Sequence, residues 1–298
     1  EAFEAFGLDM AASDKVVGLI KAIGTVQYTS ASKKLIDAAR KAYDALSAND
    51  KNFVSNYNVL TAAEKRYAQL QAQQPVDISK AKVASISNQT FSGKEKKPSV
   101  KVTYNGKTLV KAKDYKVAYS SNKNIGTAKV TITGIGSYKG KVTKTFKIIV
   151  KKNASYTVGN YRYKITNANI SGKGTVALTG VKSSSVKKKL KSITVSDSIK
   201  IGGKTFKVTE VGKSAFSSCA KATSAKIGKN VKKIGEKAFY NCKKLKKITV
   251  TATGLKSVGK NALRNIYKKA VINVPKSKLK AYKKVFKSKG QKSTVKVK

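Results

Sequence analysis

The chain of 298 residues contains no histidine and no tryptophan, and it has only two cysteines, three prolines and one methionine. Without imidazole there is no ordinary general base near neutral pH, no Ser-His or Cys-His nucleophile pair and no histidine metal ligand. Two cysteines alone supply too few ligands for a structural zinc site. The few carboxylates after residue 76 form no recognisable glycosidase-type pair. We therefore expect a non-enzymatic protein without a metal or cofactor.

Acidic residues and arginines are also scarce. The chain has 64 Lys and Arg against 14 Asp and Glu, a formal net charge of +50, yet only four of the basic residues are arginines. Arginine supplies the planar fork that reads base edges and grips phosphates, whereas lysine acts as a point charge. The lysine excess therefore indicates solubility and salt-sensitive attraction to polyanions, rather than specific recognition of nucleic acid.

Long apolar runs are absent, so we expect no membrane span. The sequence opens at Glu1 and shows no signal peptide or wall-sorting segment, which suggests a processed or excised part of a longer exported protein. The charge is uneven: residues 1–76 hold nine basic and eight acidic residues, while 77–298 hold 55 and six. This break near Pro75 predicts a domain boundary.

Residues 14–74 have helical periodicity. Apolar residues recur at helical spacing in Lys15–Ile23, in Ser32–Leu46 and again from Lys51, after an expected break and cap at Asn49-Asp50. Three such segments predict a small helical bundle. The stretch also resembles a helical repeat of large surface proteins of Gram-positive gut bacteria, and that resemblance implies a stalk or spacer.

Residues 77–150 change to a period of two. Val100, Val102 and Tyr104 alternate with polar residues and precede Asn105-Gly106, a strong hairpin signal. Further alternating runs lie at Tyr115–Tyr119, Ala128–Ile132 and Val142–Ile148. Several short strands at this spacing predict a β-sandwich. The run NIGTAKVTITGIGSYKGKVTKTFKI resembles the bacterial immunoglobulin-like modules of surface proteins.

An internal repeat dominates the last part of the chain. The segment that begins at Val208 recurs from Val231 and, more weakly, from Leu255, so that Gly212, Gly235 and Gly259 align. A repeat of this length, in the range of roughly 20–29 residues, indicates the coils of a solenoid, which bury their apolar faces only by stacking. Short alternating strands, an earlier rung at Ile193–Val195 and a hairpin around Gly202-Gly203 complete the pattern.

The units VGKSAFSSC and IGEKAFYNCKKLKKITV resemble the bacterial surface-antigen (BspA-like) leucine-rich repeats, and VPKSKLKAYKKVF resembles the C-terminal cap of that family. The predicted fold class is therefore multidomain α + β. We expect a three-helix bundle at 1–76, an immunoglobulin-like β-sandwich at 77–151 and a short leucine-rich-repeat β-solenoid with a capping helix at 152–298.

Two groups of residues are candidate binding sites. The outward strand positions form a candidate ligand face by analogy with other repeat proteins: Thr194, Lys226, Thr249 and Asn273. Lysine pairs that recur in the repeats are a candidate polyanion stripe, with solvated faces as the simpler interpretation: Lys232, Lys233, Lys243, Lys244, Lys246, Lys247, Lys268 and Lys269. Cys219 and Cys242 occupy equivalent positions, and we expect buried thiols, with a disulfide as the alternative.

Three functions fit these observations. The first is a non-catalytic segment of an extracellular, cell-surface or cell-wall protein, monomeric, whose lysines bind anionic polymers during display, wall association or adhesion. The second is an adhesin for a host protein or mucin glycan. The third is the accessory C-terminal region of a secreted hydrolase whose catalytic domain precedes Glu1.

Overall fold

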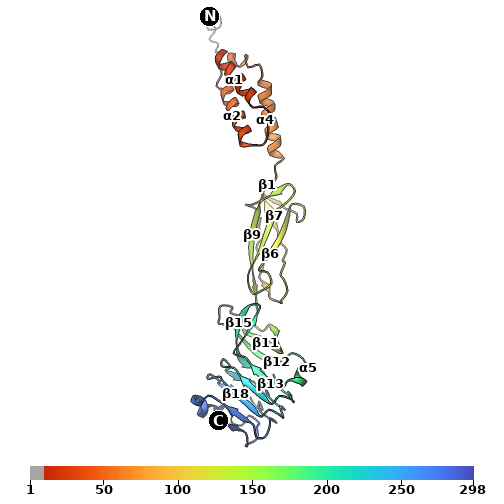
Figure 1. Cartoon of the computed structure of the whole chain (residues 1–298), viewed down its shortest axis with the longest axis vertical. Helices are drawn as coiled ribbons and strands as arrows, with labels where there is room; N and C mark the ends of the chain where they lie inside the picture. Colours follow the sequence, from red (N-terminus) through yellow and green to blue (C-terminus); the bar gives the residue numbers. More distant parts are fainter. Residues whose placement is uncertain (1–9) are drawn as a thin grey trace. The chain divides into compact units, whose positions relative to one another are not determined.

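The computed structural model describes residues 10–298. This part of the chain divides into two compact units. The first comprises the residues up to Ala81 together with Thr103–Lys116 and Ile132–Val142, and the second comprises Lys82–Val102, Val117–Thr131 and Thr143–Lys298. The three predicted domain ranges stay a prediction. Figure 1 gives the labels of the helices and strands.

The N-terminal part is helical, with three longer helices and one helical turn: α1 (Met10–Ala22), α2 (Ser30–Asp44), α3 (Ala48–Lys51) and α4 (Tyr57–Ala72). Apolar side chains from these helices share one core that includes Val16, Ile20, Ile36 and Leu60. The last helix begins at Tyr57 rather than near Lys51. Ser47 accepts a hydrogen bond from the amide of Asp50 and so caps α3, which ends after one turn.

Arg40 ties α2 to α4. Its Nε and Nη2 atoms donate to the two carboxylate oxygens of Glu64, both at 2.7 Å. The guanidinium also lies 5.6 Å from the ring centroid of Tyr43 and 5.4 Å from that of Tyr57. Those two rings stack on each other. The hydrogen bonds to Glu64, more than any other effect, raise the pKa of Arg40.

Residues 76–149 are built from short strands: β1 (Val76–Asp77), β2 (Lys82–Val83), β3 (Gln89–Thr90), β4 (Val102–Tyr104), β5 (Lys107–Thr108), β6 (Tyr115–Ser120), β7 (Gly126–Gly134), β8 (Tyr138–Lys139) and β9 (Lys141–Ile149). The sheet orders are β1-β8, β2-β4-β5 and β3-β9-β7-β6. The predicted Asn105-Gly106 turn joins β4 to β5, and both residues have the positive φ that such a turn requires. The immunoglobulin-like assignment stays a prediction.

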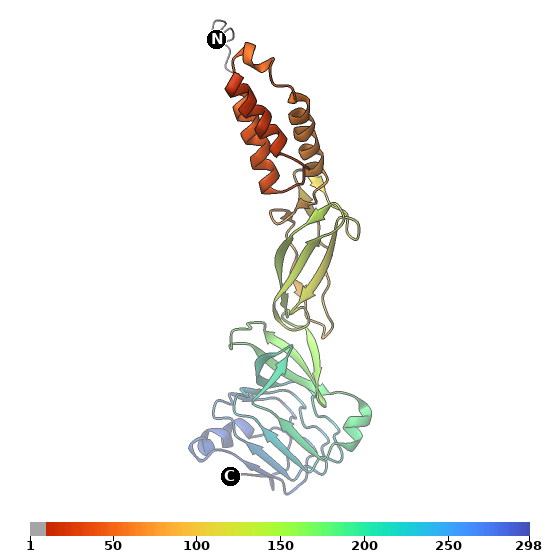
Figure 2. The same cartoon turned by 45° about the horizontal axis from the view of Figure 1, so that its top comes forward.

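The C-terminal repeats lie in the second unit and form two sheets (Figures 1 and 2). The seven-stranded sheet has the order β10-β11-β12-β15-β17-β19, with β14 paired to β15, and the five-stranded sheet has the order β13-β16-β18-β20-β21. The strands are β10 (Ser155–Val158), β11 (Tyr161–Asn167), β12 (Thr175–Val181), β13 (Ser192–Val195), β14 (Ser198–Ile201), β15 (Lys204–Val211), β16 (Ser224–Ile227), β17 (Lys233–Ile234), β18 (Lys247–Val250), β19 (Ser257–Val258), β20 (Val271–Asn273) and β21 (Lys296–Val297).

Successive repeats pair in parallel register, as expected for solenoid coils. In the five-stranded sheet Ile193 pairs with Ala225, Ala225 with Ile248 and Ile248 with Ile272. All four side chains are buried between the two sheets. The hairpin predicted around Gly202-Gly203 is present, since β14 and β15 pair antiparallel across these two glycines. Each repeat of the sequence therefore corresponds to one whole coil.

On the side of the seven-stranded sheet, glycine residues allow the backbones of adjacent coils to approach closely. A Cβ on Gly235 would lie 2.6 Å from the carbonyl carbon of Gly212 and the amide nitrogen of Lys213. A Cβ on Gly259 would lie 2.3 Å from the amide nitrogen of Glu236. No side chain fits at these distances, so Gly212, Gly235 and Gly259 form a row along which the backbones of adjacent coils are in contact.

The A-F-x-x-C segments fill the interior. Phe216 and Phe239 are both fully buried, and Cys219 and Cys242 lie beside them with no exposed surface. Both cysteines are free thiols, and the Sγ of Cys242 donates a hydrogen bond to the carbonyl oxygen of Phe216 at 3.1 Å. Contact with Cys219, followed by burial, raises the pKa of the Cys242 thiol. The structure thus has the expected buried thiols rather than a disulfide.

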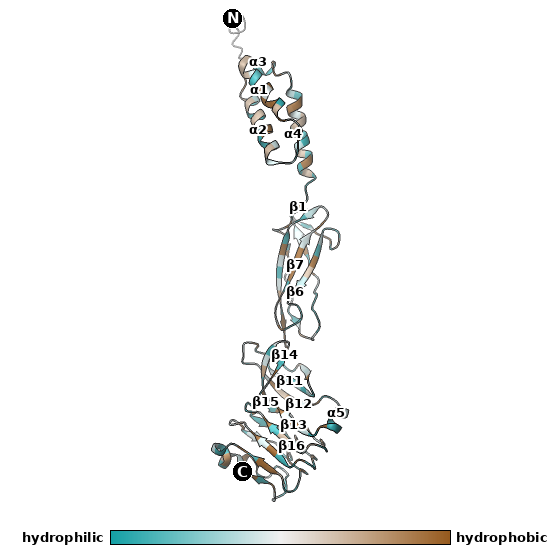
Figure 3. Ribbon diagram, in the orientation of Figure 1, coloured by the Kyte–Doolittle hydropathy of each residue, from teal (hydrophilic) through white to brown (hydrophobic). Residues whose placement is uncertain are grey.

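Two helices flank the stack. The six-residue α5 (Ser184–Lys189) connects β12 to β13 and is hydrophilic (Figure 3). The capping helix α6 (Leu279–Phe286) follows β20 and buries Tyr282 and Phe286. The Tyr282 hydroxyl donates to the carbonyl of Ala252 and accepts from the amide of Leu255. The structure thus has a helix where the spacing predicted one, and Tyr282 of this helix bonds to the loop after β18.

Candidate ligand face and lysine rows of the repeat region

The four residues of the candidate ligand face lie in one row across the five-stranded sheet. Thr194 pairs with Lys226, Lys226 with Thr249, and Thr249 with Asn273. Thr194 and Lys226 are exposed, whereas Thr249 and Asn273 are half-buried. Because alternate residues of a strand point to opposite faces, the neighbours of these four residues fill the core while they face outward. The sheet therefore presents hydroxyl, ammonium and amide groups side by side.

A second outward row runs parallel to the first. It consists of Ser192, Ser224, Lys247, Val271 and Lys296. Lys247 and Lys296 are exposed, so the face carries ammonium groups in both rows.

The lysines of the candidate stripe lie in two separate places. Six of them lie in or next to the turns that lead into the five-stranded sheet: Lys243, Lys244, Lys246, Lys247, Lys268 and Lys269. We call these six the entry lysines. Lys232 and Lys233 instead lie at β17, in the seven-stranded sheet. Lys232 and Lys246 occupy different positions within the repeat unit. The two groups therefore lie beside different sheets.

The carboxylates of the repeat region lie beside other lysines than the entry lysines. Within residues 10–298, the acidic side chains of the repeat region pair with lysines outside the entry group. The Nζ–carboxylate distances are 3.6 Å for Lys229–Asp197, 3.1 Å for Lys233–Glu210, 3.2 Å for Lys213–Glu236 and 3.9 Å for Lys237–Glu236. In the same described range none of the entry lysines forms an ion pair. Their positive charge is thus uncompensated by neighbouring side chains.

Sequence reasoning missed one exposed lysine that is not among the six entry lysines but is equivalent to two of them in the repeat alignment. Lys221, Lys244 and Lys268 occupy equivalent positions in successive repeats, and all three are exposed. The repeat alignment would have identified Lys221, but it is a single lysine rather than a pair. Lys246 also contacts an aromatic ring, because its Nζ lies 5.4 Å from the ring centroid of Tyr267. Such a contact holds the ammonium group at the turn.

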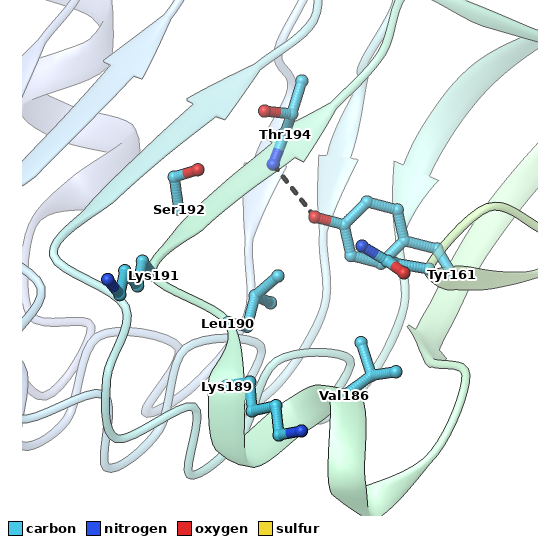
Figure 4. Close-up of a pocket in the computed structure, with 8 residues that line it drawn as sticks. Tyr161, Val186, Lys189, Leu190, Lys191, Ser192 and Thr194 are labelled. Atoms are coloured by element: carbon cyan, nitrogen blue, oxygen red, sulfur yellow. Dashed lines mark hydrogen bonds between the residues drawn. The ribbon is translucent and has the colours of Figure 1, made fainter.

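A groove at the start of the five-stranded sheet was also missed by the sequence reasoning. The hydroxyl of Tyr161, from β11, accepts a hydrogen bond of 3.2 Å from the backbone amide of Thr194 in β13 (Figure 4). The ring of Tyr161 packs edge-on against Phe216, and burial raises the pKa of Tyr161. Tyr163 lies in the same strand as Tyr161, β11 of the seven-stranded sheet, and burial raises the pKa of Tyr163 to about 12. Both phenols are therefore neutral at physiological pH.

Between residues 10 and 298, no three His, Cys, Asp or Glu side chains come close enough together to hold a metal ion. No helix in that range has the length and apolar composition needed to cross a bilayer.

Residues 209–298 match the model of the family described as "BspA type Leucine rich repeat region (6 copies)". This match covers the coils from the end of β15 to the C-terminus, and it leaves the residues before 209 outside. The C-terminal region is therefore a leucine-rich repeat region of the BspA type.

Solved structures of bacterial leucine-rich repeat proteins resemble part of the chain. They include a leucine rich cell surface protein from Faecalibacterium prausnitzii, at 25% identity over 42% of this chain and 34% of that chain, with a TM-score of 0.32. A leucine-rich repeat protein from Bacteroides ovatus has 24% identity over 40% of this chain and 35% of that chain, with a TM-score of 0.31. The pneumococcal vaccine antigen PcpA has 22% identity over 42% of each chain, with a TM-score of 0.30.

The matched part of the first two of these proteins is about a third of their length. No curated protein matches the chain.

Proposed function

We propose that the repeat region is a non-catalytic binding module of a cell-surface or secreted protein, and that its entry lysines bind an anionic polymer. The proposal rests on one observation: the carboxylates of the repeat region lie away from the entry lysines. The carboxylates of the described repeat region pair with Lys213, Lys229, Lys233 and Lys237. The entry lysines lie on adjacent coils without a carboxylate partner among residues 10–298, and such a cluster of like charges raises the local potential and attracts polyanions.

The repeat geometry supports a polymer rather than a single small anion. Equivalent lysines of successive coils are separated by about 5 Å, the spacing of paired strands. A chain with regularly spaced phosphate, sulfate or carboxylate groups can contact several such lysines at once. For an exported protein, such chains are wall teichoic acids, acidic or sulfated host glycans and released DNA. We expect an extracellular location on this basis, and a monomer because a net charge of +50 opposes self-association.

The parts before the repeats have a supporting role in this proposal. The helical segment at 1–76 is a spacer, and the strands at 77–151 are an immunoglobulin-like module. In this role they connect the repeat region to an attachment point. The described helices share a well-packed core, as a spacer requires, although Leu35, Phe53 and Val59 are exposed.

The outward row of Thr194, Lys226, Thr249 and Asn273 supports a second candidate, an adhesin for a host protein or mucin glycan. These side chains offer hydrogen-bond donors and acceptors in register on one sheet. Such a face can read a ligand by hydrogen bonding as well as by charge. Binding of a purified host ligand that persists at high salt would favour the adhesin over the polyanion binder.

The test is cosedimentation with Gram-positive cell walls, with and without teichoic acid, across a salt series. One variant replaces Lys243, Lys244, Lys246 and Lys247 with Gln. The matched control replaces Lys213, Lys229, Lys233 and Lys237 with Gln, which removes the same formal charge. We expect binding that requires teichoic acid, and a log–log salt slope that the first variant reduces by a few units, of order one per lysine.

Two results would contradict the proposal. Absence of binding at low salt would remove the polymer as a ligand and leave the lysines as a solubility feature. Equal loss in the two variants would mean that total charge, and not the entry lysines, governs attraction to the wall.

A further inference from the structure

The two sheets of the repeat region end differently at the start of the stack. The seven-stranded sheet continues from β15 through β12 and β11 to β10, whereas the five-stranded sheet stops at β13. The first complete coil is therefore formed by β12, α5 and β13. On its outer side β13 has no paired strand in the described chain. The five-stranded sheet thus begins with an open strand edge.

The backbone of β13 presents hydrogen-bonding groups at this edge. The amide of Thr194 points away from β16, because it donates to the hydroxyl of Tyr161. Successive residues of a strand direct their backbone groups to alternate sides. The backbone groups of Ser192 therefore lie on the same outer side as those of Thr194, while Ile193 and Val195 direct theirs to β16.

A groove runs along this edge. Its volume is about 650 Å³, and β13, α5 and the start of β11 supply its walls. Figure 4 shows Val186 and Leu190 on one side of β13 and the ring of Tyr161 beside Thr194. These three apolar groups are half-buried and pack against the repeat core. The groove thus combines an apolar lining with a polar strand edge.

The charge of the groove is of one sign. Its lining includes Lys189 and Lys191 and no carboxylate. Lys187 and Lys188 of α5 add to the positive potential. A second copy of this chain, with a net charge of +50, is repelled from such an edge. An extended segment with acidic side chains has complementary charge.

We propose that this groove binds an acidic peptide segment of a partner protein in extended conformation, so that the segment adds a strand to β13. The peptide backbone would pair with the amide and carbonyl of Ser192 and with the carbonyl of Thr194, because the Thr194 amide already donates to Tyr161. Its side chains would alternate between the apolar surface of Val186 and Leu190 and the ammonium groups of Lys189 and Lys191. Because β13 is a short strand, a peptide segment of about its own length suffices. The binding differs from that of an anionic polymer, since the groove recognises a backbone as well as charge.

The test is fluorescence anisotropy of labelled hexapeptides with the full chain at about 0.15 M salt, where surface charges are screened beyond about 8 Å. The probe alternates glutamate and valine. A control peptide alternates glutamate and proline, which keeps the charge but lacks half of the backbone donors and favours polyproline geometry. We expect the control peptide to bind roughly tenfold more weakly or worse, because two or more backbone hydrogen bonds are lost.

Variants of the edge provide a second arm. Ser192→Pro removes a backbone donor from the groove side, and Ser192→Ala keeps it. The double variant Lys189→Glu/Lys191→Glu reverses the charge of the groove, and Lys283→Glu/Lys284→Glu makes the same change at two exposed positions of the capping helix α6. We expect Ser192→Pro and the groove double variant to lose the glutamate–valine peptide, while the two controls retain it.

Equal affinity for the two peptides, or equal loss in the two double variants, would overturn the proposal and leave charge attraction alone. If circular dichroism shows that Ser192→Pro does not fold, the comparison of the two peptides and of the two double variants still tests the groove proposal. Cosedimentation with cell walls should be unchanged in Ser192→Pro, so failure of the groove proposal is distinguishable from failure of the polymer proposal.

Discussion

The rings of Phe216 and Phe239 stack on each other in adjacent coils, with centroids 5.5 Å apart and planes inclined by 15°. Both side chains are fully buried. Tyr161 contacts the far side of this stack, edge-on to Phe216 at 5.6 Å. The aromatic stack therefore connects the edge groove to the interior of the repeats.

Phe239→Ala should destabilise the repeat region by about 3–5 kcal/mol, because it removes a large buried ring and leaves a cavity between two coils. The measurement is urea-induced unfolding of the chain, followed by far-ultraviolet circular dichroism. Tyr240→Ala is the matched control, since its side chain is only half-buried. A loss for Phe239→Ala no larger than that for Tyr240→Ala would contradict a packing role for the stack.

Gly235→Ala should destabilise the same region by about 2 kcal/mol or more, because the new methyl group meets the backbone of the neighbouring coil at 2.6 Å and cannot be accommodated by side-chain movement. Gly254→Ala introduces the same methyl group where no atom lies within 4 Å. We expect that control to be neutral or slightly stabilising, since alanine restricts the unfolded chain. Similar urea midpoints for the two variants would refute the role of the glycine row.

Cys219 and Cys242 should not react with a thiol reagent such as DTNB in the native protein at mildly alkaline pH. Both side chains are inaccessible. Their mutual contact raises the pKa of Cys242 and lowers the pKa of Cys219, so burial alone protects Cys219. After unfolding in guanidinium without reductant, both thiols of each chain should react. Thr253→Cys, on an exposed turn, supplies a reactive thiol as a positive control. Failure of the unfolded wild-type chain to react would mean that the two cysteines are bonded.

Arg40→Ala should destabilise the helical segment by about 1 kcal/mol, because a two-pronged ion pair and contacts with two rings are lost. Arg40→Lys should recover little of this, since an ammonium group cannot make the paired hydrogen bonds to Glu64. Arg66→Ala, at an exposed position of α4, is the control. The change is measured by thermal unfolding, followed by the circular dichroism signal of the helices. Equal effects of Arg40→Ala and Arg66→Ala would contradict a role for Arg40 in linking α2 to α4.

The coil pairing was predictable because the repeat itself encodes it. The alignment that matches Gly212 with Gly235 also matches Lys226 with Thr249, and the parallel sheet has that register. The capping helix was predictable from the helical spacing of Tyr282 and Phe286. In each case a periodic pattern in the chain is the direct cause of the structure.

Other features depend on contacts that no local pattern records. The entry lysines and Lys232 look alike as sequence pairs, but the path of the coil carries them to different sheets. The groove beside β13 arises because β11 and β13 belong to different sheets that end at different points. Nothing in the sequence near Tyr161 indicates that its hydroxyl bonds to Thr194. The start of α4 was misplaced because Val54 is buried without being helical.

The hydrogen bonds of the turn segments have a consequence for how the gene can change. The amide of Phe216 donates to the carbonyl of Ala238, and the amide of Phe239 donates in the same way to Ala262. Each coil therefore offers the preceding one the same set of acceptors. An in-frame duplication of one repeat unit would find its partners already in place on both sides. The length of this region is consequently free to vary by whole coils during evolution, with the first strand edge and the final helix left intact.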